Sequence, residues 1–165
     1  EKLGIKDVEF IPKKDISSQG YCDYEWVYDD NPQNDSVYGR LYTWYAVANS
    51  KGLCPPGWHI PSESEWATLS EYFGGDQLSA EKLKEEGTEH WHSPNYAEDV
   101  SEFGALPGRL RIYFGSFSEL NSSGFWWTAS QADSETAWGR SMSNNYTLLK
   151  KEMFNKRFGF STKCN

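Results

Sequence analysis

Apolar side chains recur with helical spacing in the segment 37–52. Four of them fall at i, i+3, i+4 and i+7, which places them on one face of a helix, and Gly52 follows as a typical C-terminal stop. The pattern therefore predicts a helix over much of this segment, although its aromatic density also permits a strand. The four residues are Leu41, Trp44, Tyr45 and Ala48.

A second helix is predicted over residues 62–73. Ser62 and Glu65 form an S-x-x-E capping box, in which each side chain can bond the backbone N–H of the other residue. Trp66, Leu69 and Phe73 follow at helical spacing, and two glycines end the run. The CPPG that precedes this helix forms a stiff turn. The prolines and the cap of CPPGWHIPSESEW therefore have a structural explanation that needs no chemistry.

The remaining segments predict loops and strands. NPQNDS (31–36) is typical of a loop, EFIP and YCDYEWVYDD of strands, residues 79–86 of a short helix, and HWHSPN (90–95) of a polar loop. The C-terminal half contains short runs typical of strands, with asparagine turns at 144–145 and 155–156. Helices followed by antiparallel strands predict an α+β fold. The strand-like runs are EFGALPGRLRIYF, GFWWTAS, TAWGRSMS, YTLLKKEMF and KRFGFSTKC.

Aromatic residues make up 16% of the chain, and two of the eight tryptophans are adjacent. Trp126 and Trp127 face opposite sides of a strand, so one is expected in the core and the other against a second layer or in solvent. Most of the aromatic residues are expected to be core or sheet-packing residues. Exposed ones would suit sugar rings or protein partners, because they bury much area at a small cost in entropy.

Charge and hydropathy exclude several classes of partner. The 165 residues carry a formal net charge of −8, so nucleic acid and anionic lipid surfaces are unfavourable partners. The mean hydropathy is −0.75, and no apolar run approaches the roughly 20 residues of a membrane-spanning helix. We therefore expect no membrane insertion of this domain. Glu1 in place of an initiator Met indicates a trimmed chain, which is compatible with a removed leader.

Candidate metal and catalytic chemistry is sparse. His90 and His92 flank Trp91 and would share one face of a strand, but a polar loop is the better interpretation, and no cysteine or carboxylate cluster completes a metal site. We expect no bound metal and no cofactor. His59 is expected to be buried or half-buried and bonded to backbone. G-x-S-x-G and both phosphate-binding glycine motifs are absent. The many carboxylates are typical of solvated helix faces, yet two of them could still meet as a glycosidase pair.

Seven motifs occur in an order that resembles a known family. Together they resemble the Fibrobacter succinogenes major paralogous domain, a family of exported and surface proteins common in Bacteroidetes and Fibrobacteres. The resemblance covers about residues 21–165, whereas 1–20 match poorly within the single domain expected over 1–165. The motifs are YGRLYTWYAV (38–47), CPPGWHIPSESEW (54–66), GG (74–75) with KLK (82–84), W-x-SPN (91–95), FGALPGR (103–109), GFWWTAS (124–130) and KRFGFSTKC (156–164).

That family is similar to the C-type-lectin-like fold, which also underlies the formylglycine-generating enzyme. The resemblance implies two early helices, a central antiparallel sheet built from the C-terminal half, and chain ends that lie close together. It also implies a structural corner at 54–66 with Trp58 and Trp66 as core anchors. The calcium-lectin motifs E-P-N, Q-P-D and W-N-D are absent, and only Cys164 stands where that enzyme has a cysteine pair. Neither activity therefore carries over.

The three cysteines are Cys22, Cys54 and Cys164, an odd number that permits one disulfide and one free thiol. The residues alone leave three reduced, buried cysteines as an alternative. The resemblance brings the end of the chain beside the early helices, which implies that Cys54 and Cys164 pair and that Cys22 stays free. Such a bond would favour export to an oxidising compartment.

Neither the fold nor the resemblance supplies an activity, and our first hypothesis is a non-enzymatic binding module for a glycan or a protein. It would be exported, either to the periplasm or to the cell surface with a lipid anchor at a removed N-terminus. A carbohydrate-active hydrolase with a carboxylate pair and a structural subunit of a surface assembly are the alternatives. Recognition is expected in the turn-rich segments 110–123 and 131–147, because binding loops are usually held on a rigid scaffold. The candidate residues are Arg111, Tyr113, Phe117, Arg140, Asn144, Asn145 and Tyr146.

Overall fold

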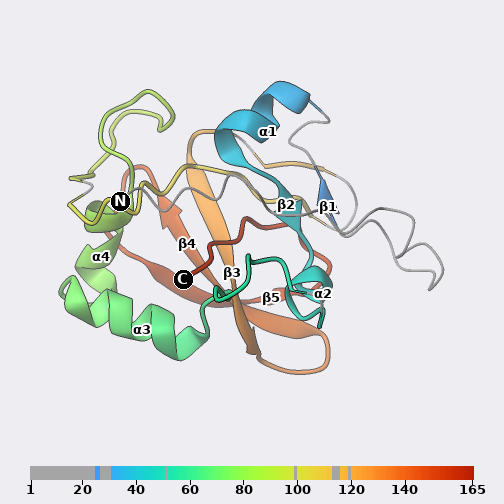
Figure 1. The fold of residues 1–165 in the computed structure, drawn as a ribbon. Helices are drawn as coiled ribbons and strands as arrows, with labels where there is room; N and C mark the ends of the chain where they lie inside the picture. The colour runs from blue at the N-terminus through green and yellow to red at the C-terminus, as the bar shows by residue number, and fades with distance from the viewer. Residues whose placement is uncertain (1–24, 27–30, 51, 99, 113–115, 119) are drawn as a thin grey trace.

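The computed structural model describes residues 25–26, 31–50, 52–98, 100–112, 116–118 and 120–165. Helices dominate the first half of the described chain, and an antiparallel sheet fills the second half, so the α+β prediction is confirmed (Figure 1). The elements in chain order are β1 (Glu25–Trp26), α1 (Pro32–Tyr38), β2 (Leu41–Tyr42), α2 (Trp44–Val47), α3 (Glu63–Tyr72), α4 (Asp76–Leu83), β3 (Ser123–Gln131), β4 (Thr136–Ser143) and β5 (Lys150–Asn155).

The main sheet has the strand order β3-β4-β5, and both strand pairs are antiparallel. The small pair β1-β2 is joined to it through the end of the chain. Phe160 forms an antiparallel bridge with Tyr42, and Ser161 forms a parallel bridge with Trp126. The C-terminal segment thus lies between the two sheets and links them. Figure 1 shows α3 and α4 on one side of the molecule and α1 and α2 on the other.

Helix α3 begins where its capping box predicts. The Ser62 hydroxyl accepts a hydrogen bond from Glu65 N, and Ser62 N donates to Glu65 Oε2 at 2.8 Å. These two bonds satisfy backbone donors that the first turn of a helix leaves without partners. Ser62 N and the Ser62 hydroxyl, which is 2.7 Å from Glu65 Oε2, both donate to this carboxylate, and with a further bond from His59 they lower the pKa of Glu65 from 4.5 to about 2. The prediction of a helix over 62–73 is confirmed.

The prediction of a long helix in 37–52 is wrong. Leu41 and Tyr42 form strand β2. The described helical residues of the segment are the last two of α1 and the four of α2, and Gly52 lies in a turn. The reason is a long-range pairing: Tyr42 N donates to Phe160 O at 2.8 Å, and Phe160 N donates to Tyr42 O at 3.0 Å. Local periodicity does not register such bonds, because the partner lies far away in the sequence.

Other expected elements are shifted or shortened. The expected loop 31–36 forms most of α1, with Asn31 Oδ1 accepting from Gln33 N at 3.1 Å, and the expected helix 79–86 begins earlier, as α4. GFWWTAS and TAWGRSMS form β3 and β4, and YTLLKKEMF supplies β5. EFGALPGRLRIYF and KRFGFSTKC contribute isolated bridges instead of long strands. Of the early strands, EFIP lies outside the described residues, and YCDYEWVYDD is described there only at β1.

Two aromatic layers cover opposite faces of β3. Trp126 is buried with Trp66 beneath α3 and α4, and Trp127 is buried against Phe160, with ring centroids 4.3 Å apart. Both members of the Trp126–Trp127 pair are therefore buried, since each face has its own layer. Gly139 lies opposite Trp127, and a Cβ there would be 2.9 Å from the Phe154 ring. Glycine thus leaves room for the aromatic cluster.

Trp58 is not the core anchor that the resemblance implies. Its side chain is 44% exposed, because the turn closed by Trp58 N and Pro55 O turns it outward. Leu53 and Ile60, on either side of that turn, are buried in its place. The corner at 54–66 is therefore anchored by aliphatic side chains and by Trp66.

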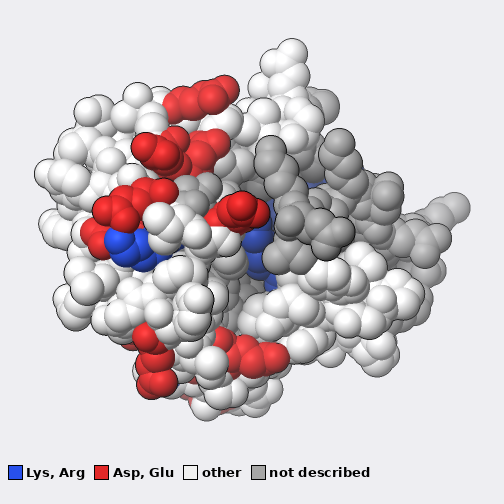
Figure 2. All heavy atoms as spheres, turned by 60° about the vertical axis from the view of Figure 1, so that its left-hand side comes forward, with Lys and Arg blue, Asp and Glu red and all other residues white. Residues whose placement is uncertain are grey.

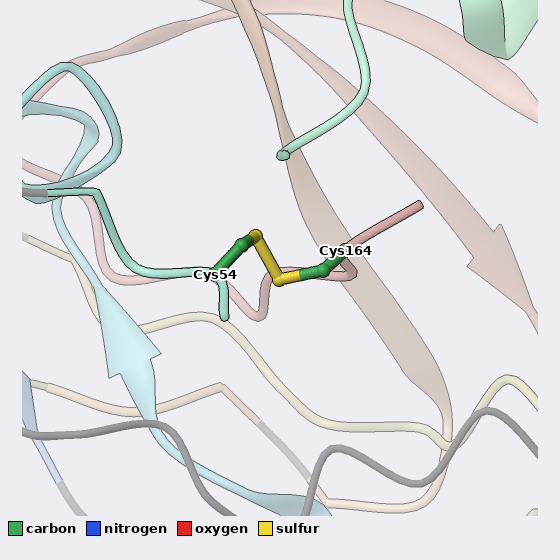
Figure 3. The surroundings of a disulfide bond; sticks show 2 residues. All are labelled: Cys54 and Cys164. Atoms are coloured by element: carbon green, nitrogen blue, oxygen red, sulfur yellow. A yellow bond between two sulfur atoms is a disulfide. The ribbon is translucent and has the colours of Figure 1, made fainter. Parts of the chain in front are cut away.

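The corner is joined to the end of the chain by a disulfide between Cys54 and Cys164, the pair that the resemblance implies (Figure 3). The Cα atoms are 5.8 Å apart, and the bond closes a sequence separation of 110 residues. Beside it, His59 N donates to Asn165 O and Asn165 N donates to His59 O. Cys22 lies outside the described residues. In the described part of the chain, no helix is both long enough and apolar enough to cross a membrane.

Ser62→Ala should lower the free energy of unfolding by about 1 kcal/mol, because it removes the N-cap acceptor. Part of the cap comes from ionised Glu65, whose pKa is lowered on folding. That contribution is present above pH 4.5 and is lost as the pH falls through about 2. Denaturant titrations at pH 7 and at low pH check both points. Thr68→Ala on the exposed face of α3 is the control. Equal losses of unfolding free energy in the two variants would contradict the role of Ser62 as the N-cap.

Replacing Cys54 and Cys164 together by serine should destabilise the protein by about 4–5 kcal/mol, because the bond restricts the unfolded chain over a long loop. Urea unfolding of the variant and of the unmodified protein measures this loss. A thiol titration of denatured, unreduced protein should find no more than one thiol, that of Cys22. Three titratable thiols would show that the bond does not form.

Candidate ligand-binding surface

Arg140, one of the expected recognition residues, is buried in the interior. Its side chain is 1% exposed, and its guanidinium bonds Glu63 Oε1 at 2.5 Å and Asp76 Oδ1 at 2.8 Å. Glu63 and Asp76 are the first residues of α3 and α4. The arginine thus joins β4 to the starts of two helices, where carboxylates are favoured by the helix dipole. We correct its assignment from ligand contact to structural ion pair.

Two further expected residues, Arg111 and Phe117, contact each other. The Arg111 guanidinium lies 5.8 Å from the centroid of the Phe117 ring, and Phe117 also packs against buried Leu41. Both side chains are half-buried. Tyr113, which lies between them in the sequence, is outside the described residues. Burial of Phe117 against Leu41 leaves little of its ring for a ligand.

Asn144, Asn145 and Tyr146, in the turn between β4 and β5, are brought beside two other loops. Asn144 Nδ2 donates to His92 O at 3.1 Å, and Asn144 O accepts from Tyr96 N at 3.2 Å. The backbone of Asn144 also donates to Ser122 O at 3.0 Å. We call the surface formed by residues 92–96, 121–122 and 144–146 the tri-loop surface.

Two tyrosine rings project from the tri-loop surface into solvent. Tyr96 is 54% exposed and Tyr146 is 59% exposed. Tyr146 is an expected recognition residue, whereas Tyr96 was not singled out by the sequence. The sequence gives only a weak indication that Tyr96 is a surface residue, namely that it directly follows the SPN turn of a polar loop. Only the bond from Tyr96 N to Asn144 O shows that the loops carrying the two tyrosines are adjacent.

A buried lysine fixes the turn that carries Tyr146. Lys84 follows α4 and is fully buried, and its Nζ donates to the carbonyl oxygens of Ser143, Asn144 and Tyr146 at 2.9, 3.1 and 3.0 Å. Burial lowers the pKa of Lys84 from 10.5 to about 8, against an opposing effect of Glu81. The KLKEE segment gives no sign of this role, because lysine is usually a surface residue.

A polar cluster supports the other side of the surface. His90 Nδ1 lies 2.8 Å from Glu85 Oε2, and the His90 ring meets the Tyr38 ring edge-on at 5.7 Å. The Tyr38 hydroxyl donates to Asn121 Oδ1 at 3.1 Å. Burial, followed by the charge of Glu85, raises the pKa of Tyr38, so the phenol stays neutral and remains a donor. The cluster therefore holds Asn121 in place.

The histidines differ in part from expectation. His59 is neither buried nor half-buried: its side chain is 60% exposed, and its Nε2 lies 2.7 Å from a carboxylate oxygen, Glu65 Oε1. His90 and His92 lie in a loop, as expected, with His90 paired to Glu85 and His92 exposed. Within the described ranges, no group of three or more His, Cys, Asp or Glu residues is placed to hold a metal ion.

A comparison with models of known protein families identifies the family of this chain. The family model described as the Fibrobacter succinogenes major domain matches residues 7–164, so its match begins before residue 21, where the resemblance was expected to start. The chain belongs to this family. No match was found among the curated proteins or among the solved structures.

Lys84→Met should lower the free energy of unfolding by about 2–4 kcal/mol, because three carbonyls lose a charged donor while the apolar stem is kept. Amide hydrogen exchange in 143–147 should accelerate more than in β3. Chemical denaturation with exchange mass spectrometry measures both effects. Lys82→Met, two residues earlier at the surface of α4, is the matched control and should change little. Equal behaviour of the two variants would show that Lys84 does not hold the turn.

Proposed function

We propose that the protein is a non-enzymatic binding module whose tri-loop surface recognises a glycan. The observation that carries the proposal is the pair of exposed tyrosines on restrained backbone. Asn144 O accepts hydrogen bonds from both Tyr96 N and Lys84 Nζ, so one carbonyl couples the two loops. An aromatic ring in a restrained position can stack on the apolar face of a sugar with little further loss of entropy.

Polar groups beside the rings suit the hydroxyls of a sugar. Asn145 is exposed, and His92 is exposed at the rim of the surface. Amide and imidazole groups offer both donors and acceptors, which is the pattern that sugar hydroxyls require. Stable protein interfaces usually need a contiguous apolar centre of several aromatic or aliphatic side chains. Two separate tyrosines among polar residues therefore favour a glycan, and a protein partner is the competing outcome.

Export to the periplasm or the cell surface forms part of the proposal. The Cys54–Cys164 bond supports it, because disulfides persist in oxidising compartments and are rare in reducing ones. A C-type-lectin-like arrangement is also proposed. It is supported by the closing segment, which returns to pair Phe160 with Tyr42 near the start of the described chain. The loops of the tri-loop surface would then be the recognition loops of that scaffold.

Tyr96→Ala and Tyr146→Ala should each weaken glycan binding about tenfold while leaving the fold intact, because each removes one stacking platform. An oligosaccharide array identifies the bound glycan, and calorimetry on that glycan measures the loss. Tyr72→Ala is the control, since Tyr72 is 82% exposed at the end of α3 and its ring contacts Phe73.

Two results would contradict the proposal. Binding that is unaffected by both tyrosine variants would place the ligand elsewhere on the protein. Release of shortened oligosaccharides during the binding assay would show that the protein is a hydrolase and not a binding module.

A further inference from the structure

The tri-loop surface is packed against helix α4, and this places it in an acidic part of the molecule. Thr147 Oγ1 donates to Gln77 O at 2.7 Å, and Ala80 N donates to Thr147 O at 3.0 Å, so the turn that bears Tyr146 rests on the helix. On the other side, Glu98 N donates to Glu81 O at 2.7 Å, two residues after Tyr96. Both tyrosines therefore come from backbone that borders α4.

Among the residues that the structure describes, carboxylates outnumber cations on this side. Figure 2 shows Asp and Glu side chains gathered over the face that the α4 side presents, with few Lys and Arg side chains among them. Glu98 has a side chain that is 57% exposed, and Glu86 and Glu89 are exposed in the loop after α4. A ligand on the two tyrosines would thus meet a negative potential.

The nearest lysines do not reverse this potential. Lys82 Nζ is paired with both Glu81 and Glu98, which together raise its pKa. Lys84 keeps its positive charge beneath the turn, but Lys82 and Lys84 together supply two charges against five carboxylates, those of Glu81, Glu85, Glu86, Glu89 and Glu98. Lys150 is exposed at the start of β5, and in the register of the sheet it lies opposite Ser141 of β4. It therefore projects from the face of the sheet opposite to Arg140 and the helices.

From this placement we infer that the ligand carries no acidic groups and is a neutral glycan or an amino sugar. The inference rests on the proposed function and narrows its substrate class. A uronate or sulfate on the tyrosines would lie near the exposed carboxylates of the loop after α4, because Asn95, next to Tyr96, donates to Glu85 O and Gly87 O on either side of Glu86. Like charges within the Debye length, about 8 Å at physiological ionic strength, repel one another. A protonated amino group would instead be attracted.

The test is an array that holds neutral, amino and acidic oligosaccharides of equal length. The probes are chitin, xylan and mannan fragments, deacetylated chitin fragments, and galacturonate, alginate and heparin fragments. We expect binding only in the neutral and amino classes, with loss in Tyr96→Ala and Tyr146→Ala. Tyrosine-dependent binding of an acidic fragment would overturn the inference and leave the proposed function standing. No binding in any class would overturn the proposed function itself.

A charge variant gives an independent measurement. Glu86→Gln with Glu89→Gln should raise the affinity for galacturonate fragments about tenfold at low ionic strength, and the gain should vanish near 1 M salt, where the Debye length is about 3 Å. Glu135→Gln is the control, because Glu135 is exposed in the turn between β3 and β4 at the other end of the sheet. An equal gain from the control, or no gain from the double variant, would show that these carboxylates do not set the selectivity.

Discussion

A single ammonium group, that of Lys84, determines how the loops at the α4 side are arranged. Removing a charge from water is costly, and the cost is repaid only when hydrogen bonds surround the buried ion. Here three carbonyl oxygens of one turn provide those bonds, so opening the turn breaks three charge-assisted hydrogen bonds at once. The same turn contacts the loop that carries Tyr96 through Asn144 O. The stability of the core is thereby coupled to the geometry of the exposed rings.

Buried cations hold other parts of the fold in the same way. Lys156 is 4% exposed, and its Nζ donates to the carbonyl oxygens of Asp133 and Ser134 in the turn between β3 and β4. Arg140 joins the first residues of α3 and α4 to the middle strand of the sheet. Each of these groups joins segments that are distant in sequence. With the disulfide, they restrain loops that have few apolar contacts of their own.

Buried cations and exposed carboxylates have different roles in this protein, and the difference bears on the proposed function. The cations within the fold are used to hold backbone and carboxylates, and exposed carboxylates predominate on the side of the molecule near α4 (Figure 2). What that surface offers a ligand is therefore aromatic rings, amides and negative charge. Aromatic stacking favours a sugar ring, and the charge selects among sugars. A scaffold with fixed loops leaves such selectivity to a small number of exposed side chains.

Local chemistry was enough to predict several elements of this protein. The capping box at Ser62 determines where α3 begins, because both of its partners lie within one turn of helix. GFWWTAS and TAWGRSMS likewise predict β3 and β4, because they are short strand-like runs separated by Gly, Ser and Asn turns. Tyr146 was recognised as a surface candidate because it lies in a turn.

Only the tertiary structure decided the features that depend on distant partners. Leu41 lies in a strand because Phe160 pairs with its neighbour Tyr42, and Trp58 is exposed because aliphatic residues around it fill the core. Lys84 and Arg140 read as ordinary surface charges in the sequence, yet both are buried. Burial of a charge depends on acceptors brought from elsewhere in the chain, and no local pattern of residues encodes where those acceptors will lie.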